Sequence, residues 1–339
     1  MAPDDRIVVL NGYPLEERHR QALAAVSDRL QFIHTSIETQ EDLDVIEDPD
    51  VEAILGDFVP TERSRLPRLR WLQYSGAGVD PLTDRAPWRR GITVTSASGN
   101  NSIPIAEYVL TWLLHVASRT EERIENQRRR QWTETRIGLT GRGLRGRTLA
   151  IVGYGSVGRE VARLAHAFGM GVLAAKARPD VLVDDGFRLA GTGDPDGSIP
   201  QRVVGFDRLG EIIAEAEFVL VSAPLTAATR GALGAAVLAA LRRDAWLINI
   251  GRGGLFDEAA LTEALRERRF GGAVLDVTVT EPLDPSSELW RLPNVIVTPH
   301  VAGLSETTWD TMTQLFAENL RRYVAGERLL NLVDPEAGY

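Results

Sequence analysis

The amino-acid sequence predicts an α/β protein with parallel sheets, and three observations support this class. Short apolar runs of buried-strand type alternate with helix-compatible stretches along the chain, which is typical of βαβ units. The length of 339 residues is sufficient for two domains with cores of their own. A turn between an apolar run and an amphipathic run has the glycine spacing G-x-G-x-x-G at residues 153–158.

The N-terminal part of the chain predicts a small parallel domain. Apolar runs predict strands at Ile7–Leu10, Phe32–Ile33, Val51–Leu55 and Trp71–Tyr74, and helical spacing predicts a helix over Glu16–Leu30. The turn after the last strand reads SGAGVD, from Ser75 to Asp80, and its small residues leave backbone N–H groups uncovered. This turn is either a cradle for a carboxylate or a tight turn capped by Asp80.

An apolar helix pattern over Ile105–Ala117 follows, and we expect the first crossing between domains at its start. The stretch from Thr148 to Gly158 then reads TLAIVGYGSVG, which is strand, glycine turn and helix start in order. In this context the first glycine permits the tight turn, the second lets the backbone approach a pyrophosphate, and the third packs helix on strand. A glycine-rich turn without a ligand is the alternative.

The βα alternation continues to the end of the chain. Strands are predicted at Val172–Ala175, Phe218–Ser222, Ala245–Ile250, Ala273–Asp276 and Val295–Thr298, with a closing helix over Glu306–Val324. The polar stretch 178–206 is too long for an ordinary connection, and we interpret it as an inserted surface loop. Ligands of open parallel sheets bind beyond the carboxyl ends of the strands, so the turns after the last four strands should share one crevice.

Three charged residues in those turns form a consistent chemical set. Arg252 lies between glycines, so its guanidinium can bind a carboxylate in a bidentate way. His300 follows Pro299 at a strand end and can exchange a proton near neutral pH. Glu281 could orient His300 and favour its protonated form. Taken singly, each residue could instead be a surface or turn residue.

The composition limits the classes of function. A content of 25% charged and 44% hydrophobic residues is ordinary for a soluble globular protein. The net charge of −9 argues against a nucleic-acid or anionic-membrane surface. The chain has no cysteine, and no metal site is expected. No run approaches the ~18 apolar residues of a membrane span, and the acidic N terminus lacks an apolar signal region, so we expect a cytoplasmic protein.

An ordered set of segments closely resembles the D-isomer-specific 2-hydroxyacid dehydrogenase family, over nearly the whole chain. The segments are GYGSVG (153–158), LINIGRGG (247–254), DVTVTEP (276–282), TPHVAG (298–303), SGAGVD (75–80) and residues 101–107. The resemblance implies a Rossmann NAD(P)-binding domain of residues 104–302, inserted into a flavodoxin-like substrate domain of residues 1–103 and 303–339. It also implies a homodimer joined through the Rossmann domain.

The resemblance further implies roles for individual residues. Arg252 would bind the substrate carboxylate together with the backbone of Ala77 and Gly78. His300 would be the acid/base group, supported by Glu281. The residues expected around the cofactor are Gly153, Gly155, Ser156, Val157, Gly158, Lys176, Arg178, Ala223, Pro224, Ile250, Asp276, His300 and Gly303. Within this set Asp276 would meet the nicotinamide amide, and Ala223 and Pro224 would cover the adenosine side.

The cofactor preference is predicted from the end of the second strand of the Rossmann domain. Enzymes that use NAD typically place Asp or Glu there, on the ribose 2′-hydroxyl. This chain has Lys176 and Arg178 instead, and two cations would attract the 2′-phosphate that an acid would repel. NADP(H) is therefore the predicted cofactor. NAD(H) is the alternative if both side chains point into solvent or pair with acids of the segment 180–185.

These observations predict an NAD(P)H-dependent reductase that converts a small 2-oxo acid, such as glyoxylate or hydroxypyruvate, to a D-2-hydroxy acid. A formate dehydrogenase is disfavoured because that enzyme carries Gln where this chain has Glu281. A nucleotide-sensing scaffold similar to certain transcriptional co-repressors is the alternative from another class. The expected partners are the small acid and a second copy of the chain, without nucleic acid or membrane.

Overall fold

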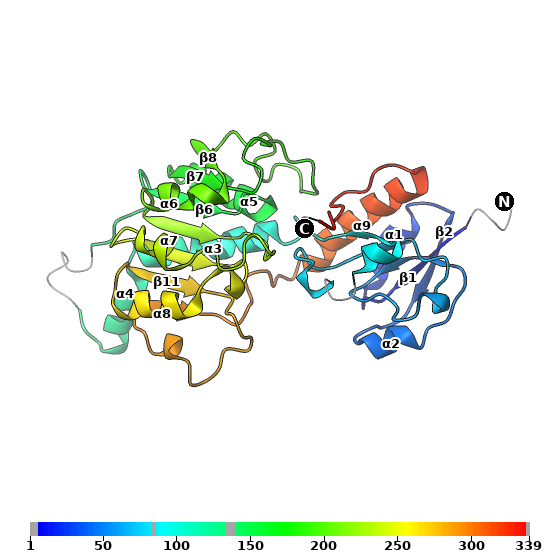
Figure 1. Cartoon of the computed structure of the whole chain (residues 1–339), viewed down its shortest axis with the longest axis horizontal. Helices are drawn as coiled ribbons and strands as arrows, with labels where there is room; N and C mark the ends of the chain where they lie inside the picture. Colours follow the sequence, from blue (N-terminus) through cyan, green and yellow to red (C-terminus); the bar gives the residue numbers. More distant parts are fainter. Residues whose placement is uncertain (1–5, 83–85, 133–139, 337–339) are drawn as a thin grey trace. The chain divides into compact units, whose positions relative to one another are not determined.

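The computed structural model describes residues 6–82, 86–132 and 140–336, and the chain divides into two compact units (Figure 1). Unit 1 comprises Met1–Asn101, Asp185–Leu189 and Ser305–Tyr339, and unit 2 comprises Ser102–Asp184 and Ala190–Leu304. The boundaries expected from the sequence lie close to the first and last crossings. They do not include the short segment Asp185–Leu189 in unit 1.

Unit 1 contains a parallel five-stranded sheet in the order β2–β1–β3–β4–β5, which is the flavodoxin-like order. The strands are β1 (Ile7–Asn11), β2 (Leu30–His34), β3 (Val51–Leu55), β4 (Trp71–Gln73) and β5 (Thr93–Thr95). The first four lie where apolar runs predicted them. Strand β5 was missed because its sequence, TVT, is too short and too polar to stand out from its surroundings.

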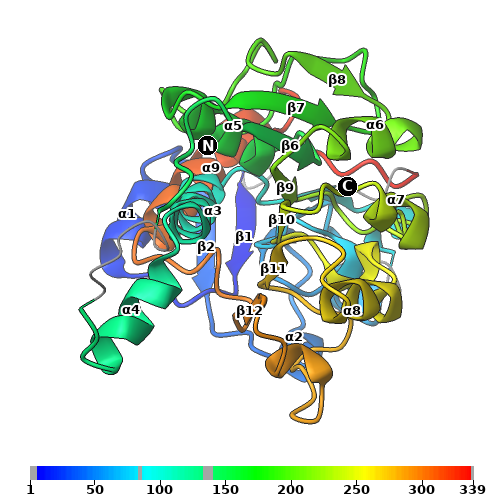
Figure 2. The same cartoon turned by 90° about the vertical axis from the view of Figure 1, so that its left-hand side faces the viewer.

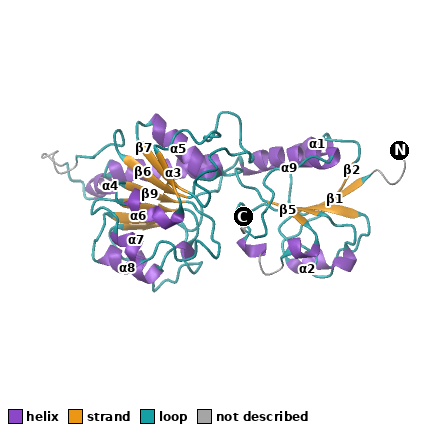
Figure 3. Cartoon of the chain, turned by 45° about the horizontal axis from the view of Figure 1, so that its top comes forward, coloured by secondary structure: helices purple, strands orange, loops and turns teal. Residues whose placement is uncertain are grey.

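Helices cover both faces of this sheet (Figure 3). Helices α1 (Glu17–Ala24) and α9 (Thr308–Ala325) pack on one face around Trp71, Leu315 and Phe316, which are all fully buried. Helix α2 (Gln40–Asp44) lies on the other face, together with the 3₁₀ turns 63–65, 80–82 and 87–90. The predicted helix over Glu16–Leu30 was too long, because the chain turns after Ala24 and Leu30 already begins β2.

Unit 2 contains a parallel seven-stranded sheet in the order β12–β11–β10–β9–β6–β7–β8. The strands are β6 (Thr148–Val152), β7 (Gly171–Ala175), β8 (Arg202–Val204), β9 (Phe218–Val221), β10 (Trp246–Asn249), β11 (Gly272–Leu275) and β12 (Val295–Val297). The strand order reverses direction between β6 and β9, as in the Rossmann fold, and this reversal is where such sheets bind ligands. The predicted Rossmann architecture is confirmed.

The two faces of the second sheet are covered by different helices (Figure 2). Helices α3 (Ser102–Ala117) and α5 (Ser156–Ala167) pack on one face. Helices α6 (Leu209–Ile213), α7 (Ala235–Ala239) and α8 (Glu258–Arg266) pack on the other. Helix α4 (Thr120–Arg128) follows α3, and 3₁₀ turns occur at 206–208, 253–255 and 288–290. No described helix is both long and apolar enough to cross a membrane.

The stretch 178–206 is more than the surface loop predicted for it. Its last part forms β8 at the edge of the second sheet. Its middle part belongs to unit 1, where Phe187 is buried against α9 residues and its N–H donates to Asn331 Oδ1 at 3.0 Å. In unit 2 the buried Arg159 donates to the carbonyl of Leu182 at 2.6 Å and to that of Asp194. Because the stretch is mostly polar, its sequence did not predict that a few of its residues anchor it to the two units.

We expect Phe187→Ala to destabilise unit 1 by about 3 kcal/mol, the usual cost of removing a buried phenyl ring. The control is Val183→Ala in the same stretch, because Val183 is 66% exposed and its truncation should stay within about 0.5 kcal/mol. Native-state hydrogen exchange of the amides of β1 and α9 measures this stability directly. Equal protection in the two variants would show that Phe187 is not part of the core of unit 1.

Candidate active site

The predicted catalytic residues all follow strands that are neighbours in the sheet of unit 2. Arg252 follows β10, Glu281 follows β11, and His300 follows β12. Because the order is β12–β11–β10 and all three strands are parallel, their carboxyl ends lie side by side. The topology therefore brings these turns to one edge of the sheet, as the sequence predicted for ligand-binding turns.

His300 and Glu281 form a direct hydrogen bond. The distance between His300 Nδ1 and Glu281 Oε2 is 2.8 Å. The other oxygen of Glu281 accepts the N–H of Thr278 at 3.1 Å, which holds the carboxylate in place. With Nδ1 engaged by a carboxylate, Nε2 is the ring nitrogen left for proton exchange. The side chains are 49% and 39% exposed, so the imidazole is accessible and the ion pair is partly screened by water.

Asp276 fixes the turn that presents His300. Its buried carboxylate accepts hydrogen bonds from Thr298 Oγ1 at 2.6 Å and from the N–H groups of Val301 at 3.0 Å and Ala302 at 2.9 Å. Its carbonyl accepts the N–H of His300 at 2.8 Å. His300 itself has a φ of +54°, a left-handed conformation that a non-glycine residue adopts only when its surroundings impose it. Asp276 supplies that constraint.

Tyr108 extends this network to helix α3. Its hydroxyl lies 2.5 Å from Thr298 Oγ1. Because Thr298 donates its proton to Asp276, Tyr108 must be the donor to Thr298. Burial raises the pKa of Tyr108 to about 12, so the phenol keeps its proton throughout the physiological range. Sequence reasoning missed both residues. Thr298 belongs to the TPHVAG segment, but no role was predicted for it. Tyr108 was interpreted only as one residue of an apolar helix.

The turn that carries Arg252 is shaped by Asn249 and two glycines. The buried Asn249 accepts the N–H of Gly251 at 3.2 Å and donates to the carbonyl of Arg252 at 3.4 Å. A Cβ added at Gly253 would lie 2.0 Å from the carbonyl carbon of Thr278, so only glycine fits this approach of two backbones. Arg252 Nη1 donates to the carbonyl of Gly251 at 2.9 Å. A guanidinium carries five donors, so this bond is compatible with a bidentate carboxylate contact.

The glycine turn fits the phosphates of a dinucleotide. Gly153 has a φ of +104°, and a Cβ there would lie 2.4 Å from the backbone nitrogen of Ala223. A Cβ at Gly158 would lie 2.4 Å from the carbonyl oxygen of Gly153. At Gly155, by contrast, no heavy atom lies within 4 Å of the added Cβ, so the space above the turn is open. Helix α5 begins at Ser156 without a side-chain cap, and the positive end of its dipole is suited to bind an anion.

Lys176 lies directly after β7, at the strand end from which cofactor preference was predicted. Its Nζ donates to the carbonyl of Val181, so the head group lies on the start of the inserted stretch. Burial, and after it the charge of Arg159, lowers the pKa of Lys176. Arg178 is exposed nearby in the sequence. Both residues therefore lie at or just beyond the carboxyl end of β7.

Ala77 and Gly78 lie in unit 1, in the turn after β4. Among the described residues, no hydrogen-bond acceptor pairs with either N–H group. The preceding Gly76 is required sterically, since a Cβ there would lie 2.4 Å from the ring of Tyr74. Two uncovered N–H groups at a strand end are suited to bind a carboxylate, which supports the predicted cradle.

The remaining predicted cofactor residues lie at the same strand ends of unit 2. Ala223 and Pro224 follow β9, Ile250 follows β10, and Gly303 lies in the loop between β12 and α9, three residues after His300. No cluster of three or more His, Asp or Glu side chains suited to a metal ion occurs in the part of the chain that the structure describes.

Comparisons with known proteins agree with this geometry. Residues 110–302 match the family described as D-isomer specific 2-hydroxyacid dehydrogenase, NAD binding domain. The chain is 33% identical to the (S)-sulfolactate dehydrogenase of Chromohalobacter salexigens, over 76% of this chain and 79% of that protein. It is 33% identical to the glyoxylate reductase of Korarchaeum cryptofilum, over 80% and 77%. A D-isomer specific 2-hydroxyacid dehydrogenase from Xanthobacter autotrophicus, solved with NADPH and MES, matches with a TM-score of 0.78, at 29% identity over 99% of this chain and 100% of that one.

We expect Gly253→Ala to lower kcat/KM by about a hundredfold, the usual effect of misplacing catalytic groups by about 1 Å. The added methyl group forces apart the turns that carry Arg252 and Glu281. Gly254→Ala is the matched control, because its Cβ would meet only side-chain atoms, of Leu225 at 3.0 Å and of Arg230 at 3.4 Å, and no backbone. Steady-state measurements of kcat/KM for the two variants test this prediction. Similar losses in both would show that the contact between the Gly253 and Thr278 backbones is not critical.

Proposed function

Because the chain belongs to the D-isomer-specific 2-hydroxyacid dehydrogenase family, we propose that it reduces small 2-oxo acids of the glyoxylate and hydroxypyruvate class to D-2-hydroxy acids. The hydrogen bond between His300 and Glu281 carries this proposal, because it provides a proton-exchanging group on the same sheet as the dinucleotide-binding turn. The glyoxylate reductase of Korarchaeum cryptofilum supports the substrate class. A co-repressor-like scaffold can keep the same three charged residues, so turnover with a panel of 2-oxo acids is the test that separates the two functions.

In this proposal Arg252 binds the substrate carboxylate through its planar guanidinium. A bidentate contact of this kind fixes both the position and the orientation of the acid group. The uncovered N–H groups of Ala77 and Gly78 supply further donors to the same carboxylate. A small substrate has little else to hold it, so binding and orientation rest mainly on its acid group.

His300 gives a proton from Nε2 to the carbonyl oxygen of the substrate. The nicotinamide cofactor, when bound, supplies the hydride to the carbonyl carbon. Glu281 keeps the imidazole ring oriented through its hydrogen bond to Nδ1. Asp276 holds the turn of His300, and we expect it also to meet the nicotinamide amide. A carboxylate offers about four acceptor sites, and three are taken by the turn.

We propose NADPH as the preferred cofactor, with Lys176 and Arg178 at the 2′-phosphate. The ammonium of Lys176 has three donors, and the bond to the Val181 carbonyl takes only one of them. The structure from Xanthobacter autotrophicus was solved with NADPH, which supports the preference. If the side chains of Lys176 and Arg178 both point into solvent, we expect NAD(H) to be the cofactor instead. We also expect the active form to be a homodimer joined through unit 2.

The first prediction concerns His300 as the proton donor. His300→Asn should lower kcat for reduction at least about a hundredfold, the usual contribution of a general acid. The affinity for NADPH should be little changed, because the asparagine carries no charge and the glycine turn is untouched. His166→Asn, on the exposed last turn of α5, is the matched control. Near-normal turnover of the His300 variant would remove it from the mechanism.

The second prediction concerns Glu281 as the residue that orients His300. Glu281→Gln keeps the shape of the side chain but removes the charge from the group that lies 2.8 Å from His300 Nδ1, so kcat for reduction should fall at least about tenfold, as expected for loss of one charged hydrogen bond. Steady-state rates of the parent and the variant test this. An unchanged kcat would mean that Glu281 is only a turn residue.

The third prediction concerns Lys176 and the cofactor. Lys176→Asp should weaken NADPH more than NADH, by about 1–3 kcal/mol for one charged hydrogen bond lost. Lys176 is the only lysine in the sequence, so amine acylation followed by peptide mapping reports on this side chain. NADPH should protect it from acylation better than NADH does. A parent enzyme with equal or higher kcat/KM for NADH would contradict the preference.

A further inference from the structure

Asp57 places a carboxylate beside the predicted carboxylate cradle of unit 1. It follows strand β3, and the cradle at Ala77–Gly78 follows β4, which is the parallel neighbour of β3 in the sheet. Ser75, in the same turn as the cradle, donates its hydroxyl to Asp57 Oδ1 at 2.5 Å. Asp57 is half-buried and Ala77 is exposed, so both can be reached from solvent. The Asp57 carboxylate is thus a direct neighbour of the turn proposed to bind the substrate.

Only one oxygen of Asp57 has a partner in the part of the chain that the structure describes. Tyr13 donates its hydroxyl to Asp57 Oδ1 at 2.9 Å, and Oδ1 is also the oxygen that accepts Ser75. The Tyr13 ring is buried against Trp309 and Phe316, with the ring centroids 5.2 and 5.8 Å away. Burial, and after it the charge of Asp57, raises the pKa of Tyr13, so the phenol stays a donor. Oδ2 accepts no hydrogen bond and forms no ion pair among the described residues.

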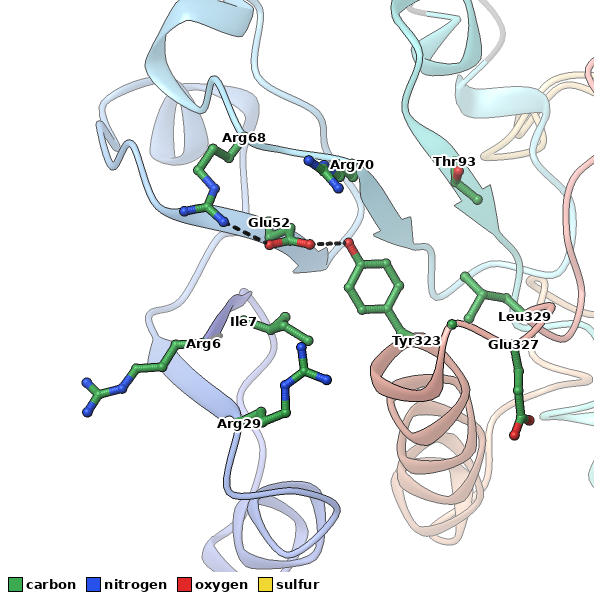
Figure 4. Close-up of a pocket in the computed structure, with 11 residues that line it drawn as sticks. Arg6, Ile7, Arg29, Glu52, Arg68, Arg70, Thr93, Tyr323, Glu327 and Leu329 are labelled. Carbon is green, nitrogen blue, oxygen red and sulfur yellow. Dashed lines mark hydrogen bonds and ion pairs between the residues drawn. The ribbon is translucent and has the colours of Figure 1, made fainter. Parts of the chain in front are cut away.

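The other end of the same strand has a similar pair of carboxylate and tyrosine, in which both carboxylate oxygens are used (Figure 4). Glu52, near the amino end of β3, accepts the Tyr323 hydroxyl on Oε1 at 2.8 Å. Its Oε2 lies 3.4 Å from Nη2 of Arg68. A half-buried carboxylate is stabilised by each donor that replaces lost water. Asp57 Oδ2 is therefore suited to a ligand that brings a donor, whereas Glu52 is already satisfied by the protein.

We propose that Asp57 Oδ2 accepts a hydrogen bond from a hydroxyl group on the third carbon of the substrate, and so selects 2-oxo acids of the hydroxypyruvate type. This inference rests on the proposed function, in which Ala77 and Gly78 bind the substrate carboxylate. A small acid bound there has its remaining atoms only a few bonds from the turn, and Ser75 fixes Asp57 at the start of that turn. A carboxylate is an acceptor only. It favours a hydroxyl group, leaves a methyl group without a partner and repels a second carboxylate.

Hydroxypyruvate and pyruvate differ only in this hydroxyl group, so the ratio of their kcat/KM values is the measurement. The parent, saturated with the nicotinamide cofactor, should favour hydroxypyruvate at least about tenfold, as expected for one hydrogen bond to a charged group. Asp57→Asn keeps an oxygen for Tyr13 and Ser75 but replaces Oδ2 by an amide nitrogen, which is a donor. Its ratio should therefore be at least about tenfold lower than that of the parent. Because the negative charge is lost, kcat/KM for oxaloacetate should rise relative to that for pyruvate.

Glu52→Gln is the matched control, because it makes the same chemical change near the other end of β3, away from the cradle. Its ratio should equal that of the parent. A purely structural role of Asp57 would lower the rates with all three acids in parallel, and unchanged ratios in Asp57→Asn would overturn the inference. The same ratio change in Glu52→Gln would also overturn it.

The outcome for the parent separates this inference from the proposed function. A parent that reduces pyruvate as well as hydroxypyruvate would overturn the role of Asp57, while the reductase function would stand. Absence of turnover with every 2-oxo acid, glyoxylate included, would contradict the reductase function itself, and the inference with it.

Discussion

The Asp276 carboxylate is the constraint on which the candidate active site depends. It is buried, and three donors of the following turn converge on it. These bonds help to hold His300 at a positive φ, where its ring meets Glu281. A buried carboxylate that accepts three hydrogen bonds from one turn favours a single conformation of that turn, because any other would leave the charge with fewer partners. The geometry of the proton-exchanging group therefore comes from backbone amides as much as from the catalytic side chains.

Much of this arrangement could be predicted from the sequence, because it follows from chain order. Apolar runs marked nearly every strand of the two sheets, and the rule that parallel strands end at one edge brought Arg252, Glu281 and His300 to neighbouring turns. The roles expected for these three residues came from the resemblance of their motifs to the D-isomer-specific 2-hydroxyacid dehydrogenase family. Gly153, Gly158 and Gly253 prove sterically necessary, because another backbone approaches within reach of a Cβ at each of them; for Gly253 the sequence indicated no such contact.

What could not be predicted depends on contacts between residues that are distant in the sequence. Tyr108 joins the network through Thr298, 190 positions away, and no local pattern marks it. Phe187 belongs to unit 1 although it lies within a polar stretch of the other part of the chain. Strand β5 was not predicted, because a run of three residues is too short to show the alternation of apolar and polar side chains that is typical of a strand.

The central claim is that this site performs acid-assisted reduction of a small 2-oxo acid. Initial rates of cofactor oxidation with glyoxylate, hydroxypyruvate, pyruvate and a phenyl-substituted 2-oxo acid, each with NADPH and with NADH, test it most directly. The account predicts the highest kcat/KM for glyoxylate or hydroxypyruvate with NADPH, and the D-isomer as the product from hydroxypyruvate. Absence of turnover with every acid and both cofactors would contradict it and favour a nucleotide-binding scaffold.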